Sequence, residues 1–195
     1  MTQPASPTAS KTPDTALANT YPLSEFYAHA KVPMPPIEII SGDTVPEPFK
    51  SLLVHHNDMT PTLEAFHKSE IHLEIINRER RGDFYFREVV LRLHRSEAPV
   101  EFGAIKVYIG RFPEEAQDLI SQEYVPLGRI LKDCGLSHRT EARAFLRVQS
   151  DDLIAEKFEL TTPAVLFGRK AVISDSQGRP LSEIVEILPP IGQST

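Results

Sequence analysis

The sequence predicts an α+β fold in a single domain, with one mostly antiparallel β-sheet and helices packed on one side of it. Three observations support this prediction. Apolar and polar residues alternate at the period of two that is typical of strands, these runs follow one another across short polar turns, and helix-like segments fall between them. The length of 195 residues and the hydrophobic content of 41% are those of one folded domain.

The first part of the chain is rich in proline. Nine of the 17 prolines fall within the first fifty residues, and the opening stretch is mainly Pro, Ser, Thr and Ala. Such a stretch buries too little apolar surface to offset the entropy of ordering it. We therefore expect a proline-rich disordered tail and extended arm over 1–45, a folded domain over 46–190 and a short tail over 191–195. A transit peptide is the less favoured alternative, because the opening stretch has no arginine.

The first half of the domain is expected to contain two short helices and a three-stranded meander. Residues 46–56 begin with proline and an acid, which favours a helix start, and residues 62–67 form a second short helix. Apolar and polar residues alternate over 71–75, and 84–94 and 100–109 are two further strands. Strands joined by such short polar turns pair antiparallel.

The second half of the domain mixes helices and strands. Acids or a proline in the first turn mark each expected helix. The expected helices are 113–122, 126–132 and 151–158. The expected strands are 143–149, 165–174 and 181–188, and the last two are joined by a hairpin turn containing Gly178.

Composition and charge exclude several classes of protein. The net charge of -6 disfavours binding to nucleic acid through phosphates, and no apolar run reaches the roughly 18 residues that span a bilayer. The single cysteine, Cys134, forms no internal disulfide and indicates a reducing compartment. The histidines match no standard zinc spacing, and no Walker, GxGxxG or nucleophile-elbow motif is present. We expect a cytoplasmic protein with no metal, cofactor, nucleic-acid partner or membrane span.

An arginine interrupts the more apolar face of the strand 84–94. Because side chains alternate along a strand, Arg87 shares its face with Tyr85, Val89 and Leu91. A buried guanidinium keeps its proton and needs an anionic partner. That partner is either a protein carboxylate in a structural ion pair or the carboxylate of a ligand, and the pattern alone leaves both open.

A glutamate occupies a similar position in the last strand. Glu186 lies on the face of Ile184 and Leu188, and the opposite face, which carries Glu183, is also largely apolar. The strand is therefore expected to be central, and a glutamate in such surroundings is a candidate for acid–base chemistry. The alternative is a structural pair with Arg87 or Arg169.

The segment 124–129 offers a third candidate. Pro126 at a helix start leaves the next backbone N–H groups free, and Gly128 permits close approach. The Leu127 N–H is then a possible donor to an anion, although most helix starts of this kind bind only water.

Several short motifs occur in a fixed order over roughly residues 50–190. They are Asp58-Met59-Thr60 with a helix after it, FYFREV at 84–89, VPLG at 125–128, GRK at 168–170, and GRP at 178–180 leading to Val185-Glu186. In order and spacing they resemble the chorismate lyase family, the chorismate pyruvate-lyases, including the divergent branch of cyanobacteria and actinobacteria.

The resemblance implies a chorismate lyase-like fold and a lyase that eliminates pyruvate from chorismate to give 4-hydroxybenzoate, in ubiquinone or quinone biosynthesis. It implies no cofactor or metal, a monomer, and chorismate and the aromatic acid product as the small-molecule partners. In this family a strand arginine and two backbone N–H groups hold the ring carboxylate, and a glutamate contacts the hydroxyl end. Carried over, Arg87, Met59, Leu127 and Glu186 bind the substrate, and Glu186 and Arg87 are the catalytic residues.

Some alternatives stay open. The register of the glutamate against the Gly-Arg-Pro turn differs by one residue between family branches, which leaves Glu183 as a fallback. Glu186 would either protonate the departing ether or take the ring proton. The main alternative function is a non-catalytic domain that binds a small aromatic carboxylate, because the same fold resembles the effector-binding half of some bacterial transcription regulators. A third is an interaction protein with a decayed pocket.

Overall fold

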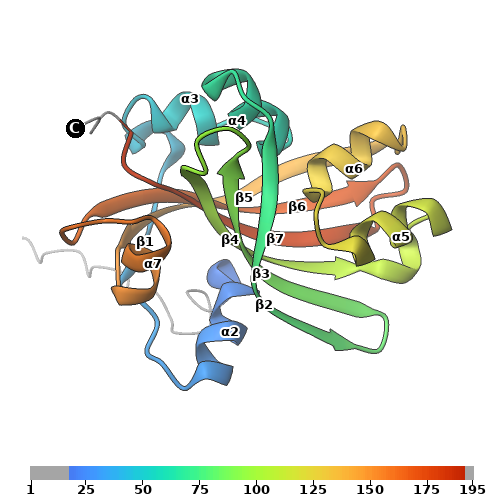
Figure 1. Cartoon of the computed structure of the whole chain (residues 1–195), viewed down its shortest axis with the longest axis horizontal. Coiled ribbons are helices and arrows are strands. Elements are labelled where there is room, and N and C mark those ends of the chain that lie inside the picture. The colour runs from blue at the N-terminus through green and yellow to red at the C-terminus, as the bar shows by residue number, and fades with distance from the viewer. Residues whose placement is uncertain (1–17, 192–195) are drawn as a thin grey trace, which may run out of the picture.

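A computed structural model of the chain describes residues 18–191, so the expectations for residues 1–17 and 192–195 lie outside the described part. At its centre is one antiparallel sheet of seven strands in the order β1-β5-β6-β7-β4-β3-β2 (Figure 1). The strands are β1 (Ile37–Ile40), β2 (Ile71–Arg81), β3 (Phe84–Leu93), β4 (Pro99–Tyr108), β5 (His138–Gln149), β6 (Val165–Asp175) and β7 (Pro180–Leu188). The predicted α+β class with a mostly antiparallel sheet is confirmed.

Helices lie against both faces of this sheet (Figure 1). The first face carries α3 (Phe49–Leu53), α4 (Met59–His67), α5 (Glu114–Gln122) and α6 (Leu127–Asp133). The second face carries α2 (Leu23–Ala30) and α7 (Asp152–Lys157), and short 3-10 helices span Gly42–Thr44 and Ile109–Arg111. The larger layer matches the expectation of helices on one side, whereas α2 and α7 form a second layer that the sequence analysis did not foresee. Over residues 18–191, no helix is both long enough and apolar enough to cross a membrane.

Strand β3 shows why both faces need a cover. Val89 and Leu91 pack with Leu63 of α4 on the first face, whereas Val90 packs with Leu23 of α2 on the second. Central strands that are apolar on both sides must be shielded from water on both sides. An apolar face on one side of β3 therefore does not imply that the other side is open to water. Helices can cover both faces of the sheet.

Residues 18–45 belong to the folded structure. The expected extended arm is wrong over Leu23–Ala30, which is helix α2, and β1 adds a strand to the sheet by pairing with β5. Leu23 and Tyr27 are buried, and the Tyr27 hydroxyl donates to Asp151 at 2.7 Å. Burial of these two side chains contributes free energy that opposes the entropic cost of ordering this segment. The proline-rich composition had suggested that this cost would not be met.

Three other elements are longer than expected. α4 begins at Met59 rather than at residue 62, because Pro61 lies in the first turn, where its missing N–H is not needed. β2 continues to Arg81 and β5 begins at His138, because each pairs with its neighbour along most of that length. The expected strands leave out these polar ends, and long-range pairing includes them.

Candidate functional site

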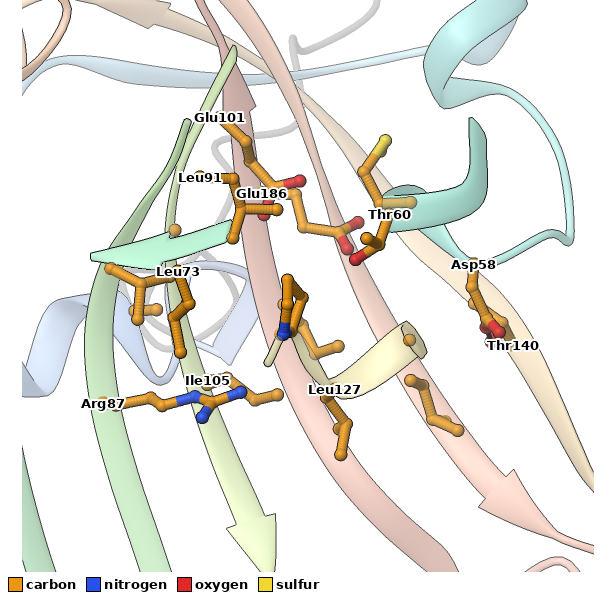
Figure 2. A pocket seen from close by; sticks show the side chains of 18 of the residues that line it. Asp58, Thr60, Leu73, Arg87, Leu91, Glu101, Ile105, Leu127, Thr140 and Glu186 are labelled. Atoms are coloured by element: carbon orange, nitrogen blue, oxygen red, sulfur yellow. Dashed lines mark hydrogen bonds between the residues drawn. The ribbon is translucent and has the colours of Figure 1, made fainter. Parts of the chain in front are cut away.

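A cavity lies between the first face of the sheet and the starts of α4 and α6 (Figure 2). Its lining atoms surround about 540 Å³ of space, part of which is open to solvent. The sequence-predicted residues Met59, Arg87, Leu127 and Glu186 all line it. The apolar part of the wall consists of Leu73, Val89, Leu91, Ala104, Ile105, Ile173 and Ile184. The fold thus brings the four candidates to one place, while their roles remain predictions.

Pairing across the central strands fixes where the charged side chains lie. Arg87 of β3 is opposite Ile105 of β4. Two residues back along β4, Gly103 is opposite Glu186 of β7, which in turn is opposite Arg169 of β6. Successive same-face positions on a strand are about 7 Å apart. Arg87 therefore lies at one end of the cavity and Glu186 at the other (Figure 2).

The Arg87 end holds a cation that no described residue pairs. Arg87 is 2% exposed, and its Nε and Nη1 have no hydrogen-bond partner among the described residues. The charge of Glu123 acts on Arg87, but Glu123 pairs with Arg78 and accepts from the Tyr85 hydroxyl at 2.5 Å. Burial lowers the pKa of the Arg87 guanidinium from 12.5 to about 10, so it remains charged at neutral pH. Within residues 18–191, the structural ion pair proposed as one alternative for Arg87 is not formed.

The opposite end holds an arginine that the protein pairs fully. Arg169 is completely buried, and its Nε donates to Glu186 Oε2 at 2.5 Å. Its other nitrogens donate to the backbone carbonyls of Leu53, His55 and Asn57 at 3.2–3.4 Å. Burial and the positive charge of Arg169 lower the pKa of His55. The ion pair with Arg169, which was one alternative for Glu186, is thus present. Glu186 also lines the cavity, so it has both positions at once.

A second acid, which the sequence analysis missed, lines the cavity beside Glu186. Glu101 of β4 is 5% exposed, and its Oε2 has no hydrogen-bond partner in the described structure. Burial, followed by the negative charge of Glu186, raises the pKa of Glu101 well above the usual 4.5. Strand alternation contained a signal, since Glu101 shares a face with Gly103 and Ile105, but a charge near a strand end is by default assigned to solvent.

Two helix starts meet above the cavity. Met59 is the first residue of α4 and Leu127 the first of α6, so their N–H groups have no partner within their helices. A methyl group placed on Gly128 would lie 3.3 Å from Asp58 Cβ and from Thr60 Oγ1. Only glycine allows the two helix starts to approach so closely without displacing these neighbours. The residues of both expected backbone donors, Met59 from the family resemblance and Leu127 from its helix start, therefore line the same cavity.

The Asp58 side chain connects the start of α4 to strand β5. It does not cap α4 but accepts hydrogen bonds from Thr140 and, at 2.8 Å, from His138 of β5. The other ring nitrogen of His138 lies 2.7 Å from the Leu136 carbonyl. The start of α4 is thereby connected to the strand that follows α6.

Glu183, the fallback for the acid, does not line the cavity. It lies on the second face, where it pairs with Lys170 at 3.2 Å and accepts from the Tyr108 hydroxyl at 2.9 Å. These contacts lower its pKa, although burial alone would raise it. Of Glu183 and Glu186, it is therefore Glu186 that lines the same cavity as Arg87, at the opposite end.

Other chemistry-bearing residues form no second centre in the described part of the chain. No group of three or more His, Cys, Asp or Glu there could hold a metal ion. Cys134 is half-buried and packs beside the hydrophobic cluster of α5 and α6, as its position after a helix suggested.

Comparison with known proteins informs the fold only. No family model matches the chain, and no curated protein does either. Among solved structures, a gene product of Staphylococcus aureus, SA0254, is 8% identical, with 70% of this chain and 90% of that chain covered and a TM-score of 0.52. PhnF from Mycobacterium smegmatis is 13% identical, with 70% and 65% covered and a TM-score of 0.52.

A third solved structure is described as a transcriptional regulator of the GntR family from Bacillus cereus. It is 17% identical, with 65% of this chain and 96% of that chain covered and a TM-score of 0.46. The seven-stranded antiparallel sheet and its helices confirm the predicted chorismate lyase-like fold. Because one fold hosts many functions, the function has to be argued from the cavity.

Proposed function

We propose that the chain binds a small organic acid in the cavity, with the ligand carboxylate on Arg87 and an aromatic or otherwise apolar body against the strands. The observation that carries this proposal is the buried Arg87 guanidinium, two of whose nitrogens have no partner in the described structure. A buried charge without a counterion destabilises a fold, so its presence in a cavity wall favours a ligand as the missing anion.

The chemistry of this end suits a carboxylate. A guanidinium presents its N–H groups in a planar fork that matches the two oxygens of a carboxylate. The backbone N–H groups of Met59 and Leu127, at the starts of α4 and α6, add donors from the other side of the cavity. These three residues are the proposed binding residues for the acid group.

The middle of the cavity suits an apolar body. Leu73, Leu91 and Ile105 line the space between the Arg87 end and the Glu186 end and carry no polar side-chain atoms (Figure 2). Burying apolar ligand surface there is favourable by about 25 cal/mol per Å². An aromatic monocarboxylate fits both the apolar middle and the cationic end.

A second candidate function is the chorismate pyruvate-lyase reaction, favoured by Glu186, which lines the cavity at the end away from Arg87. In this reaction the bond between the ring and the enolpyruvyl oxygen breaks, the ring loses a proton, and the released enolpyruvate gains one to become pyruvate. Glu186 would serve as the proton donor or acceptor, and Arg87 would hold the ring carboxylate. Aromatisation supplies the driving force, so orientation and desolvation would be the main contributions of the protein.

Titration with 4-hydroxybenzoate tests the binding proposal. Arg87→Ala should weaken binding by about 2–5 kcal/mol, the usual cost of removing one half of a buried charge pair. Arg92→Ala is the matched control, because Arg92 is on the same strand but pairs with Glu74 and does not line the cavity. If the unaltered protein shows neither heat of binding nor a thermal shift with aromatic acids, the proposal is wrong.

Incubation with chorismate, with the products identified, tests the second candidate. Release of pyruvate together with 4-hydroxybenzoate, lost in Glu186→Gln, would establish the lyase. The appearance of 3-hydroxybenzoate would indicate a different enzyme. If the protein binds aromatic acids tightly but does not consume chorismate, the lyase reaction is excluded and the binding function remains.

A further inference from the structure

We infer that Glu101 is the residue that determines ligand specificity at the end of the cavity away from Arg87, where its neutral carboxyl group donates a hydrogen bond to a ligand oxygen. The inference rests on the proposed binding of an organic acid and adds the chemical class of ligand. That class is a monocarboxylate carrying an uncharged acceptor oxygen, from a hydroxyl, ether or carbonyl group, opposite its acid group.

The position of Glu101 allows this contact. It precedes Gly103 by two residues on β4 and therefore shares its face, and Gly103 is opposite Glu186 on β7. Figure 2 shows the Glu101 and Glu186 carboxyl groups together at one end of the cavity, with the Arg87 guanidinium at the other. A ligand whose carboxylate meets Arg87 therefore extends toward Glu101.

Among the described residues, no cation forms a salt bridge with Glu101, although the charge of Arg169 acts on it from nearby. The only buried cation on that side, among the described residues, is Arg169, and its N–H groups are used by Glu186 and by backbone carbonyls. Glu101 Oε2 is buried without any hydrogen-bond partner. Nothing in the packing of β4 requires a carboxyl group here, because the neighbouring cavity positions Leu91 and Ile105 are apolar.

The surroundings favour the acid form of Glu101 over the ionised form. Burial and the nearby negative charge of Glu186 raise its pKa well above 4.5. A neutral carboxyl group has one O–H donor, and a buried donor is stabilised when an acceptor reaches it. Since the described protein supplies no acceptor, the ligand is the group that completes the hydrogen bond.

The charge balance of the cavity points to the same ligand class. Of the charged side chains that line the cavity, Arg169 is paired with Glu186, and Asp58 accepts from His138 and Thr140. Among the described lining residues, Arg87 is therefore the one cation left for a ligand carboxylate. A second carboxylate near Glu186 would be repelled. Chorismate carries two carboxylates, and its second one would meet no unpaired cation among these residues, which favours the binding function over the lyase.

Two para-substituted benzoates of equal size test the hydrogen bond. In 4-methoxybenzoate the ether oxygen accepts but cannot donate, and 4-ethylbenzoate replaces that oxygen by a methylene group. The unaltered protein should bind the methoxy compound about two- to tenfold more tightly, the range of one net hydrogen bond. Glu101→Leu should bring the ratio to about one, and Glu101→Gln, whose amide also donates, should preserve most of it. Both variants replace a buried acid by an uncharged side chain, so folding is not expected to suffer.

The outcomes separate this inference from the proposed function. If both benzoates bind in an Arg87-dependent manner but with a ratio of one in the unaltered protein, Glu101 makes no such bond and the inference is overturned. If 4-(aminomethyl)benzoate binds more tightly than either, and Glu101→Gln removes this preference, Glu101 is ionised and the inference is again overturned. If no benzoate binds, the proposed function itself fails, and the inference fails with it.

Discussion

The two buried arginines of the cavity wall differ in what the protein provides for them. Arg169 has a carboxylate and three backbone carbonyls within hydrogen-bond distance, whereas Nε and Nη1 of Arg87 have none among the described residues. Both side chains are almost fully buried, so burial does not explain the difference. The comparison separates an arginine that stabilises the fold from one that is available to a ligand.

The largest expected effect concerns the paired arginine. Arg169→Met should reduce the free energy of unfolding by about 3–5 kcal/mol, because it leaves Glu186 buried without its counterion. Urea unfolding followed by circular dichroism measures this loss. Arg143→Met is the control on the neighbouring strand, since its half-exposed pair with Glu141 should contribute less than about 1 kcal/mol. Equal losses in the two variants would contradict a structural role for Arg169.

The acids at the Arg169 end should make stability depend on pH. The folded-state pKa of Glu101 is raised, so its contribution is complete below the unfolded-state pKa and is lost as pH rises through the folded-state pKa. Within that window the loss is about 1.4 kcal/mol per pH unit for one proton. Unfolding curves of the unaltered protein and of Glu101→Gln, measured at several pH values, should therefore converge toward low pH and diverge as pH rises. Parallel curves would show that Glu101 ionises normally.

Replacing Arg87 should change the free energy of unfolding in the opposite direction to replacing Arg169. Arg87→Met, measured without ligand, should increase the free energy of unfolding by about 1–2 kcal/mol, because an uncompensated buried charge is replaced by an apolar side chain of similar length. Such a gain in stability with a loss of binding is the pattern of residues kept for function. A marked loss of stability would mean that Arg87 has a protein partner after all.

The smallest expected effect tests whether Glu123 compensates Arg87 from a distance. In a double-mutant cycle with Arg87→Met and Glu123→Gln, the coupling energy should stay below about 1 kcal/mol, because Glu123 is already engaged by Arg78 and Tyr85. The same cycle with Arg169→Met and Glu186→Gln should give several kcal/mol. Similar coupling energies in the two cycles would remove the distinction between the arginines.

The sequence predicted residues that line the cavity where local alternation carries the signal. Arg87 and Glu186 stand out because each interrupts an apolar strand face, and Leu127 because a proline precedes it at a helix start. Met59 followed from the family resemblance rather than from its own residue type. Arg169 was considered only as a possible partner of Glu186, and the structure shows that it has this role.

The sequence did not predict features that depend on contacts between distant parts of the chain. The significance of Glu101 depends on β4 lying between β3 and β7, an order that periodicity along one strand does not contain. α2 and β1 were missed because their stability comes from contacts with the sheet, and not from the proline-rich composition around them. In both cases the deciding contacts join residues far apart in the chain.

The close contact of the two helix starts has a kinetic consequence. α4 and α6 touch at Gly128, and Arg129 of α6 also pairs with Glu64 of α4 at 2.5 Å. The two helix starts therefore form one cover over part of the cavity, and we expect ligand exchange past this cover to require both helix starts to shift together. The observed rate of binding should then level off at high ligand concentration, at the rate of that opening. Residence time of the ligand would be set by the contact between the helices as much as by the groups that hold the ligand.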